Sequence, residues 1–187
     1  MIKKEDTSKR KAIVWTVLCL VFVCVIAFFL RGVLVYKAFP LNYVDEIKNY
    51  SGEYSIDEYL ISAVIATESG FDATAESSSG AMGLMQIMPD TGVWAAQKIG
   101  IESFDVQMLN DPDVNIRIGC WYLNYLKDKY DGDAKKVLAA YNAGPSRVDD
   151  WVDNDGVLRE IPFVETENYV VKVQRNYNIY KGLYDDF

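Results

Sequence analysis

The sequence predicts a mainly α-helical protein in which one transmembrane helix precedes a single folded domain. Residues 12–30 form a run of 19 uncharged residues. The rest of the chain contains stretches of helical periodicity separated by clusters of glycine, proline and serine, and it lacks a convincing alternating strand pattern. A chain of 187 residues is long enough for one core and a short accessory segment, but not for two sizeable cores.

The apolar run at residues 12–30 predicts the transmembrane helix, because 19 residues at about 1.5 Å each reach the thickness of the hydrocarbon core. A buried core helix usually carries a polar face, and a cleaved signal peptide has a shorter apolar core, so both alternatives fit less well. Five basic residues precede the run, whereas only Arg31 and Lys37 follow it directly. We therefore expect residues 1–11 to form a cytoplasmic tail and the remainder to lie outside the cytoplasmic membrane.

The exported part of the chain is acidic. Beyond residue 31 it retains 13 basic and 25 acidic side chains, a formal charge of −12. This charge disfavours nucleic acid as a partner. Pro40 and Gly52 indicate that residues 31–52 form a stalk, and we expect the folded domain to occupy residues 53–187.

A capping-box pattern marks the first helix of the domain. Ser55 fits the N-cap position and Glu58 follows three residues later, which predicts a helix running to Gly70. Further helices are expected over residues 90–99, 113–129, 134–141 and 166–180. The predicted domain is therefore mainly helical.

The composition limits the available chemistry. The chain has no histidine and three cysteines, two of them inside the apolar run. This excludes Ser-His and Cys-His nucleophilic machinery, argues against a zinc cluster and leaves no disulfide framework in the domain. We expect no metal and no cofactor, so catalysis would have to come from carboxylates, tyrosines, lysines or amides.

Glu68 is the carboxylate best placed for acid chemistry. Ile61 and Ile65 align with it at helical spacing, so it ends an apolar stripe near the helix C-terminus. Both the apolar surroundings and the negative end of the helix dipole disfavour a charged carboxylate and should raise its pKa. A solvated glutamate at a helix end is the plainer interpretation, and the following segments decide against it.

Two further segments have compositions typical of a binding groove. GAMGLMQIMP at residues 80–89 combines glycines, methionines and an amide, which suits close backbone approach and an apolar groove wall. AAYNAGPSRV at residues 139–148 places Tyr141 and Asn142 at a helix end before the Gly144-Pro145 break. Each segment alone could reflect packing and turn formation.

Together these segments resemble the Slt-type lytic transglycosylases, which share a lysozyme-like fold with the goose-type lysozymes. Four blocks carry the resemblance in the family's order: Glu68-Ser69-Gly70-Phe71; Ala75-x-Ser77 with GAMGLMQIMP; AAYNAG; and Glu165-Thr166-x-x-Tyr169-Val170. The resemblance covers about 130 residues from Ser55 onward. Ala73 stands where many members have proline, a departure that does not touch the chemistry.

The resemblance implies a lysozyme-like catalytic domain, and it implies a role for each motif residue. Glu68 would be the catalytic acid and base. The substrate-binding residues would be Ser77, Gln86, Met88, Tyr141 and Asn142 along the saccharide groove, with Glu165 and Tyr169 closing the site from the C-terminal helix.

The resemblance also implies a reaction on peptidoglycan glycan strands. In families that use the substrate's own acetamido group, one carboxylate is sufficient. Glu68 would protonate the departing N-acetylglucosamine oxygen and then take the proton of the muramyl C6 hydroxyl, which yields a 1,6-anhydromuramyl end. If Glu165 were a second catalytic carboxylate, the reaction would instead be a hydrolysis.

Two rival interpretations stay open at this point. A muramidase of the same fold would admit water and release a reducing end. A catalytically idle glycan-binding scaffold could serve a wall-spanning secretion or conjugation apparatus, although such a module gains little from an acid in an apolar position. Besides the glycan strands, the sequence predicts the cytoplasmic membrane as a partner through residues 12–30.

Overall fold

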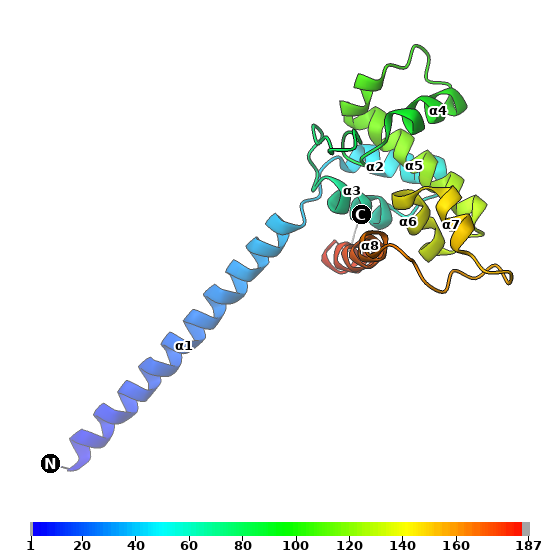
Figure 1. The fold of residues 1–187 in the computed structure, drawn as a ribbon. Helices are drawn as coiled ribbons and strands as arrows, with labels where there is room; N and C mark the ends of the chain where they lie inside the picture. Colours follow the sequence, from blue (N-terminus) through cyan, green and yellow to red (C-terminus); the bar gives the residue numbers. More distant parts are fainter. Residues whose placement is uncertain (1, 185–187) are drawn as a thin grey trace. The chain divides into compact units, whose positions relative to one another are not determined.

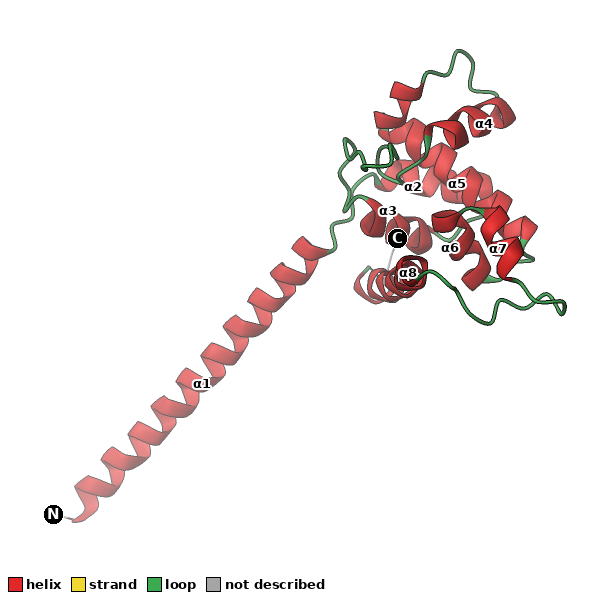
Figure 2. Ribbon diagram, viewed as in Figure 1, coloured by secondary structure: helices red, strands yellow, loops and turns green. Residues whose placement is uncertain are grey.

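The computed structural model describes residues 2–184, which form two compact units divided between Pro40 and Leu41. Nearly all of the regular structure in this part of the chain is helical, apart from isolated β-bridges (Figures 1 and 2). In chain order the helices are α1 (Ile2–Ala38), α2 (Val44–Tyr54), α3 (Glu58–Glu68), α4 (Pro89–Ile99), the 3-10 helix η1 (Val106–Asn110), α5 (Pro112–Lys129), α6 (Ala134–Ala143), α7 (Pro145–Trp151) and α8 (Val164–Leu183).

The first unit consists mainly of α1. Its segment Ile13–Ala38 is long and apolar enough to cross a membrane, a property that some signal sequences share. The predicted span at residues 12–30 lies within this helix, which continues beyond the predicted end. Figure 1 does not fix the position of α1 relative to the second unit.

The second unit packs its helices around α5 and α3. Helix α5 contacts α2, α4, α6 and η1, while α3 contacts α2 and α8. Helix α6 contacts α5, α7 and α8, which joins the two groups. Large aliphatic side chains of α3 and α5, including Ile61, Ile65, Ile116 and Leu123, are fully buried in the core.

Helix α2 is a difference from the sequence prediction, which assigned residues 31–52 to a stalk. Ile47 and Tyr50 are three residues apart and both are buried, so α2 has an apolar face that packs against α5. The Tyr50 hydroxyl donates a hydrogen bond to Asp113 Oδ1 at 2.6 Å. The linker between the units is therefore short, and Gly52 lies inside a helix rather than in a stalk.

The predicted capping box is also wrong. Ser55 has a φ of 54° and ends α2, and Asp57 is the N-cap of α3, where its side chain accepts hydrogen bonds from the backbone N–H groups of Tyr59 and Leu60. Glu58 instead accepts a hydrogen bond from the Ser51 hydroxyl at 3.2 Å. The other predicted helices lie within α4, α5, α6 and α8, each shifted by at most a few residues.

Candidate active site

Glu68 is the last residue of α3, and the helix carries it to the edge of the apolar core. Ile61, Val64 and Ile65 on the preceding turns are fully buried. The Glu68 side chain is itself largely buried, and this loss of water raises the pKa of its carboxyl group from the ordinary value of 4.5 to about 7. The predicted rise of the Glu68 pKa thus has its cause in burial, and the carboxyl group exchanges its proton near neutral pH.

Two residues of α8 oppose the effect of burial on Glu68. Tyr169 is buried, and its hydroxyl interacts with the Glu68 carboxylate and lowers the carboxyl pKa. The geometry of this interaction falls short of a full hydrogen bond, since the Tyr169 hydroxyl has no partner among the described residues. The charge of Lys172, whose Nζ donates to the Thr67 carbonyl at 3.1 Å, lowers the Glu68 pKa further.

Tyr141 lines the neighbouring groove and lies within the electrostatic influence of Glu68. Burial raises its pKa well above the usual value, and the charge of Glu68 adds to this shift. The Tyr141 hydroxyl is therefore protonated at neutral pH, and it donates a hydrogen bond to the Met85 carbonyl at 2.9 Å. A phenol fixed in this way can accept, but not donate, a further hydrogen bond.

The segment around residues 75–88 is shaped by close backbone contacts. Two isolated β-bridges pair Met82 with Glu76 and with Ile87. A Cβ on Gly83, whose φ is +74°, would lie 2.2 Å from the Leu109 carbonyl oxygen and 2.3 Å from Asn115 Nδ2. Only glycine fits this position. The sequence predicts that the backbone makes a close contact at the glycines of this motif. At Gly83 this contact is with η1 and α5 of the protein itself.

Asn115 anchors the same segment from within α5. Its buried side chain accepts a hydrogen bond from Met85 N at 2.8 Å and donates to the carbonyls of Met82 and Leu109 at 2.9 and 2.7 Å. Met85 is fully buried against Gly119, so it belongs to the core rather than to a groove wall.

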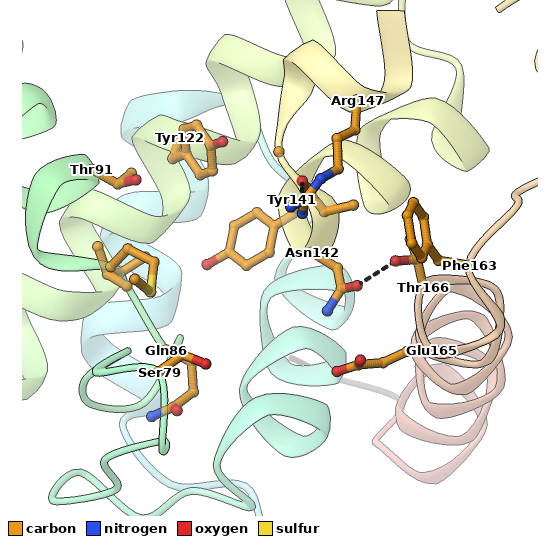
Figure 3. Close-up of a pocket in the computed structure, with 14 residues that line it drawn as sticks. Ser79, Gln86, Thr91, Tyr122, Tyr141, Asn142, Arg147, Phe163, Glu165 and Thr166 are labelled. Atoms are coloured by element: carbon orange, nitrogen blue, oxygen red, sulfur yellow. Dashed lines mark hydrogen bonds between the residues drawn. The ribbon is translucent and has the colours of Figure 1, made fainter. Parts of the chain in front are cut away.

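A groove of about 570 Å³ lies beside this segment (Figure 3). Five of the residues that were predicted to bind substrate line it: Gln86, Met88, Tyr141, Asn142 and Glu165. Glu68 and Tyr169 are not among the lining residues, but the charge of Glu68 raises the pKa of Tyr141, which is one of them. Ser77 is not among them either: its hydroxyl accepts a hydrogen bond from Ala81 N at 2.9 Å and holds the turn before the groove.

The lining amides have definite orientations. Gln86 Nε2 donates to the carbonyls of Ala75 and Gly83 at 3.0 and 2.9 Å, which leaves its Oε1 as the group available to a ligand. Asn142 Oδ1 accepts a hydrogen bond from the Thr166 hydroxyl at 2.9 Å, which leaves its Nδ2 as a donor (Figure 3). The groove therefore offers an acceptor on one segment and a donor on another, as a sugar with hydroxyl and acetamido groups requires.

Sequence reasoning missed nine lining residues. They are Ser79, Ile87, Thr91, Tyr122, Ala143, Gly144, Arg147, Phe163 and Thr166. Several of them are next to a recognised motif in the sequence, and this proximity could have identified them. Tyr122, in contrast, lies on α5 and is far from any motif. Burial raises the pKa of Tyr122 to about 12, so it is a neutral hydroxyl in the groove.

Among the side chains that the structure describes, no cluster of three or more histidine, cysteine, aspartate or glutamate residues has the geometry of a metal site. Cys120 is buried and unpaired, and burial raises the pKa of its thiol. The groups that converge on the groove are thus a carboxylic acid, tyrosine hydroxyls and amides.

The domain is thus helical, with a largely buried carboxyl group beside a groove lined by hydroxyls and amides, as the resemblance to lysozyme-like domains implied. The sequence profile of the transglycosylase SLT domain matches residues 45–163, and the chain belongs to this family. The match begins at the start of α2, in agreement with the structure rather than with the predicted stalk.

Known proteins of the family are similar to this chain over its folded part. A soluble lytic murein transglycosylase of Escherichia coli is 38% identical over 145 residues, which are 73% of this chain and 22% of that protein. A membrane-bound lytic murein transglycosylase C of Edwardsiella ictaluri is 38% identical over 118 residues, 57% of this chain and 32% of that protein. The chain thus spans about a fifth to a third of the length of these relatives.

A solved structure extends the similarity to three dimensions. It is the lytic transglycosylase Slt of Pseudomonas aeruginosa, crystallised as an inactive mutant with a glutamate changed to glutamine. The TM-score is 0.72 at 35% identity, over 77% of this chain and 24% of that one. This similarity confirms the predicted mainly α, lysozyme-like fold.

Proposed function

We propose that this chain is a membrane-anchored lytic transglycosylase that cleaves the bond between N-acetylmuramic acid and N-acetylglucosamine in peptidoglycan and leaves 1,6-anhydromuramyl ends. The observation that carries the proposal is the Glu68 carboxyl group, whose pKa is raised to about 7 beside a groove with matched sugar-binding groups. A group that acts first as acid and then as base needs such a pKa.

The first step breaks the glycosidic bond. Protonated Glu68 donates its proton to the departing N-acetylglucosamine oxygen, while the acetamido oxygen of the muramyl residue attacks C1 from the other face. The Gln86 and Asn142 amides orient the sugars, and the Tyr169 hydroxyl interacts with the carboxylate as it becomes charged. Met88, which is 44% exposed, offers an apolar contact to a sugar ring.

The second step forms the anhydro ring. The Glu68 carboxylate takes the proton of the muramyl C6 hydroxyl, whose oxygen attacks C1 and displaces the acetamido oxygen. Glu68 ends protonated as it began, and no water is consumed. The Pseudomonas relative, inactive after a glutamate-to-glutamine change, supports a mechanism that depends on one glutamate.

The test compares the detergent-solubilised chain with its Glu68→Gln variant on purified peptidoglycan, with mass spectrometry of the released muropeptides. We expect products about 18 Da lighter than hydrolytic ones, the mass of one water, and none from Glu68→Gln. Glu102→Gln is the matched control, because Glu102 is exposed on the loop after α4 and should leave activity unchanged.

Each other outcome assigns a rival function. Reducing-end products would make the protein a muramidase, and Glu165→Gln would then show whether Glu165 is its second carboxylate. If wild type and Glu68→Gln bind peptidoglycan equally without releasing anything, the chain would be a glycan-binding module.

The proposed anchor is α1, with the N-terminus in the cytoplasm and the domain outside. Its apolar segment Ile13–Ala38 and the membrane-bound relative support this location. Protease added to intact spheroplasts should then digest the domain but spare an N-terminal tag; the reverse pattern would contradict this orientation. Recruitment by a secretion or conjugation apparatus stays a prediction, testable by co-purification of the tagged chain.

A further inference from the structure

A cluster of four aromatic rings lies on α4 and α5 beside the groove. The Trp94 ring on α4 meets Trp121 and Tyr125 on α5 edge to face, with ring centres 4.8 and 4.9 Å apart. The Tyr125 ring lies nearly parallel to those of Trp121 and Tyr122, with ring centres 5.9 and 6.3 Å apart. The cleavage mechanism assigns no role to these rings.

The aromatic cluster is continuous with the groove. Thr91 and Tyr122 line the groove on the side opposite Glu165 (Figure 3). On α4, Trp94 follows Thr91 by three residues, so both side chains lie on one face of the helix. On α5, Tyr125 follows Tyr122 at the same spacing. The faces that line the groove therefore continue directly into the cluster.

The same rings lead back towards the candidate acid. The Tyr122 ring centre is 5.4 Å from that of Tyr141, which lies within the electrostatic influence of Glu68. A row of rings thus runs from Tyr141 through Tyr122 to Tyr125. A ligand that is bound near the acid and extends along this side of the groove meets the aromatic cluster next.

The aromatic cluster is open to such a ligand. Tyr125 is 37% exposed, and Trp94 and Trp121 are half-buried. A group of neighbouring aromatic side chains in contact with water indicates a binding surface. Tyrosine and tryptophan combine a flat apolar ring with one hydrogen-bonding group, which suits a sugar ring with C–H groups on its face and hydroxyls at its edge.

The proposed substrate favours the glycan strand as the occupant. A strand is a polymer, so a strand bound at the acid has to continue beyond the groove over the adjoining surface. We propose that the aromatic cluster is a further sugar-binding subsite, at which Trp94, Trp121 and Tyr125 bind a sugar ring of the strand outside the groove. This inference rests on the proposed function and adds a preference for long strands over fragments that fill only the groove.

The experiment measures binding by the full chain in detergent, with Glu68→Gln in every protein so that strands stay uncut. The ligands are stem-free glycan strands, released by an amidase and separated by length, and the disaccharide. Tyr125→Leu removes the exposed ring, whereas Tyr125→Phe keeps it. Tyr177→Leu is the matched control, because Tyr177 is a half-buried tyrosine on α8 that does not line the groove.

Tyr125→Leu should raise the Kd for long strands about 2- to 10-fold and leave the Kd for the disaccharide unchanged. Tyr125→Phe and Tyr177→Leu should bind both ligands as the parent does. An equal loss for both ligands would overturn the proposal, because the ring would then support the fold or the groove itself. An unchanged Kd at every length would also overturn it and would leave the aromatic cluster as a docking face for a protein.

Tryptophan fluorescence tests the aromatic cluster directly. Long strands should shield the fluorescence from quenching by acrylamide more than the disaccharide does, because only long strands cover Trp94 and Trp121. Changing both to phenylalanine should abolish this additional shielding. If long strands and the disaccharide shield equally in the parent, no sugar covers the aromatic cluster and the proposal fails.

These binding measurements separate this inference from the proposed function. If the chain with Glu68 intact cleaves nothing, yet the preference for long strands exists and depends on Tyr125, the proposed function fails and the subsite stands. If cleavage occurs without any such preference, the subsite fails alone.

Discussion

The burial of Glu68 predicts a dependence of stability on pH that is independent of any activity. In the unfolded chain this carboxyl group has its ordinary pKa of 4.5, and in the folded domain burial raises it to about 7. The folded state therefore binds the proton more tightly. The stabilisation from the protonated group is fully present below pH 4.5 and is lost as the pH rises to about 7.

The difference between the two pKa values corresponds to about 3 kcal/mol of unfolding free energy. About 2.5 kcal/mol of this stabilisation is lost as the pH rises from about 5 to about 8. Glu68→Gln removes the titrating group and keeps the shape. The wild type and the variant should thus be similarly stable at the lower pH, and the variant should be more stable at the higher pH by roughly that amount.

The assay is denaturant unfolding in detergent at both pH values, followed by tryptophan fluorescence, because Trp94, Trp121 and Trp151 lie in the domain. Other carboxylates titrate equally in both proteins, so the difference between them isolates Glu68. Glu102→Gln should follow the wild type. If Glu68→Gln loses as much stability between the two pH values as the wild type does, the burial argument is refuted.

Three further predictions follow from the same contacts. First, kcat/KM should fall above about pH 7, because Glu68 must begin protonated; a flat alkaline limb would count against it. Second, Lys172→Gln should move that fall to higher pH by removing a charge that lowers the Glu68 pKa, whereas Arg175→Gln should not. Third, Asn115→Ala, which removes three buried hydrogen bonds, should cost about 3 kcal/mol of unfolding free energy, and Asn110→Ala, whose hydrogen bond is long and exposed, less than about 0.5 kcal/mol.

Most of the helices could be predicted because their signals are local. Apolar spacing and the proline or glycine at each end define α4, α5 and α6 within a few residues. Helix α2 was missed because its apolar face is short and its sequence is polar and contains Gly52. What stabilises it is the packing of Ile47 and Tyr50 against α5, about 65 residues away in the chain.

The position of the candidate acid, Glu68, was predictable because its signal is also local. The residues that surround it in the fold were not predictable. The helical spacing of Ile61, Ile65 and Glu68 predicts a carboxylate at the end of an apolar stripe. The residues that adjust its pKa, Tyr169 and Lys172, are about 100 positions away, and no local pattern shows that α8 packs on α3. Arg147 belongs to the motif segment at residues 139–148, but no local pattern shows that it lines the groove beside Phe163.

The position of Glu68 relative to the groove depends on two consecutive backbone carbonyls. The Ser69 hydroxyl, next to the acid, donates to the Leu84 carbonyl at 2.8 Å, and the Tyr141 hydroxyl of the groove donates to the Met85 carbonyl at 2.9 Å. Asn115 fixes Met85 from the third side. Side chains at the end of α3, on α5 and on α6 therefore all hydrogen-bond to the backbone of this short segment. This shared attachment fixes the position of the acid relative to the groove, which is the preorganisation that the proposed reaction needs.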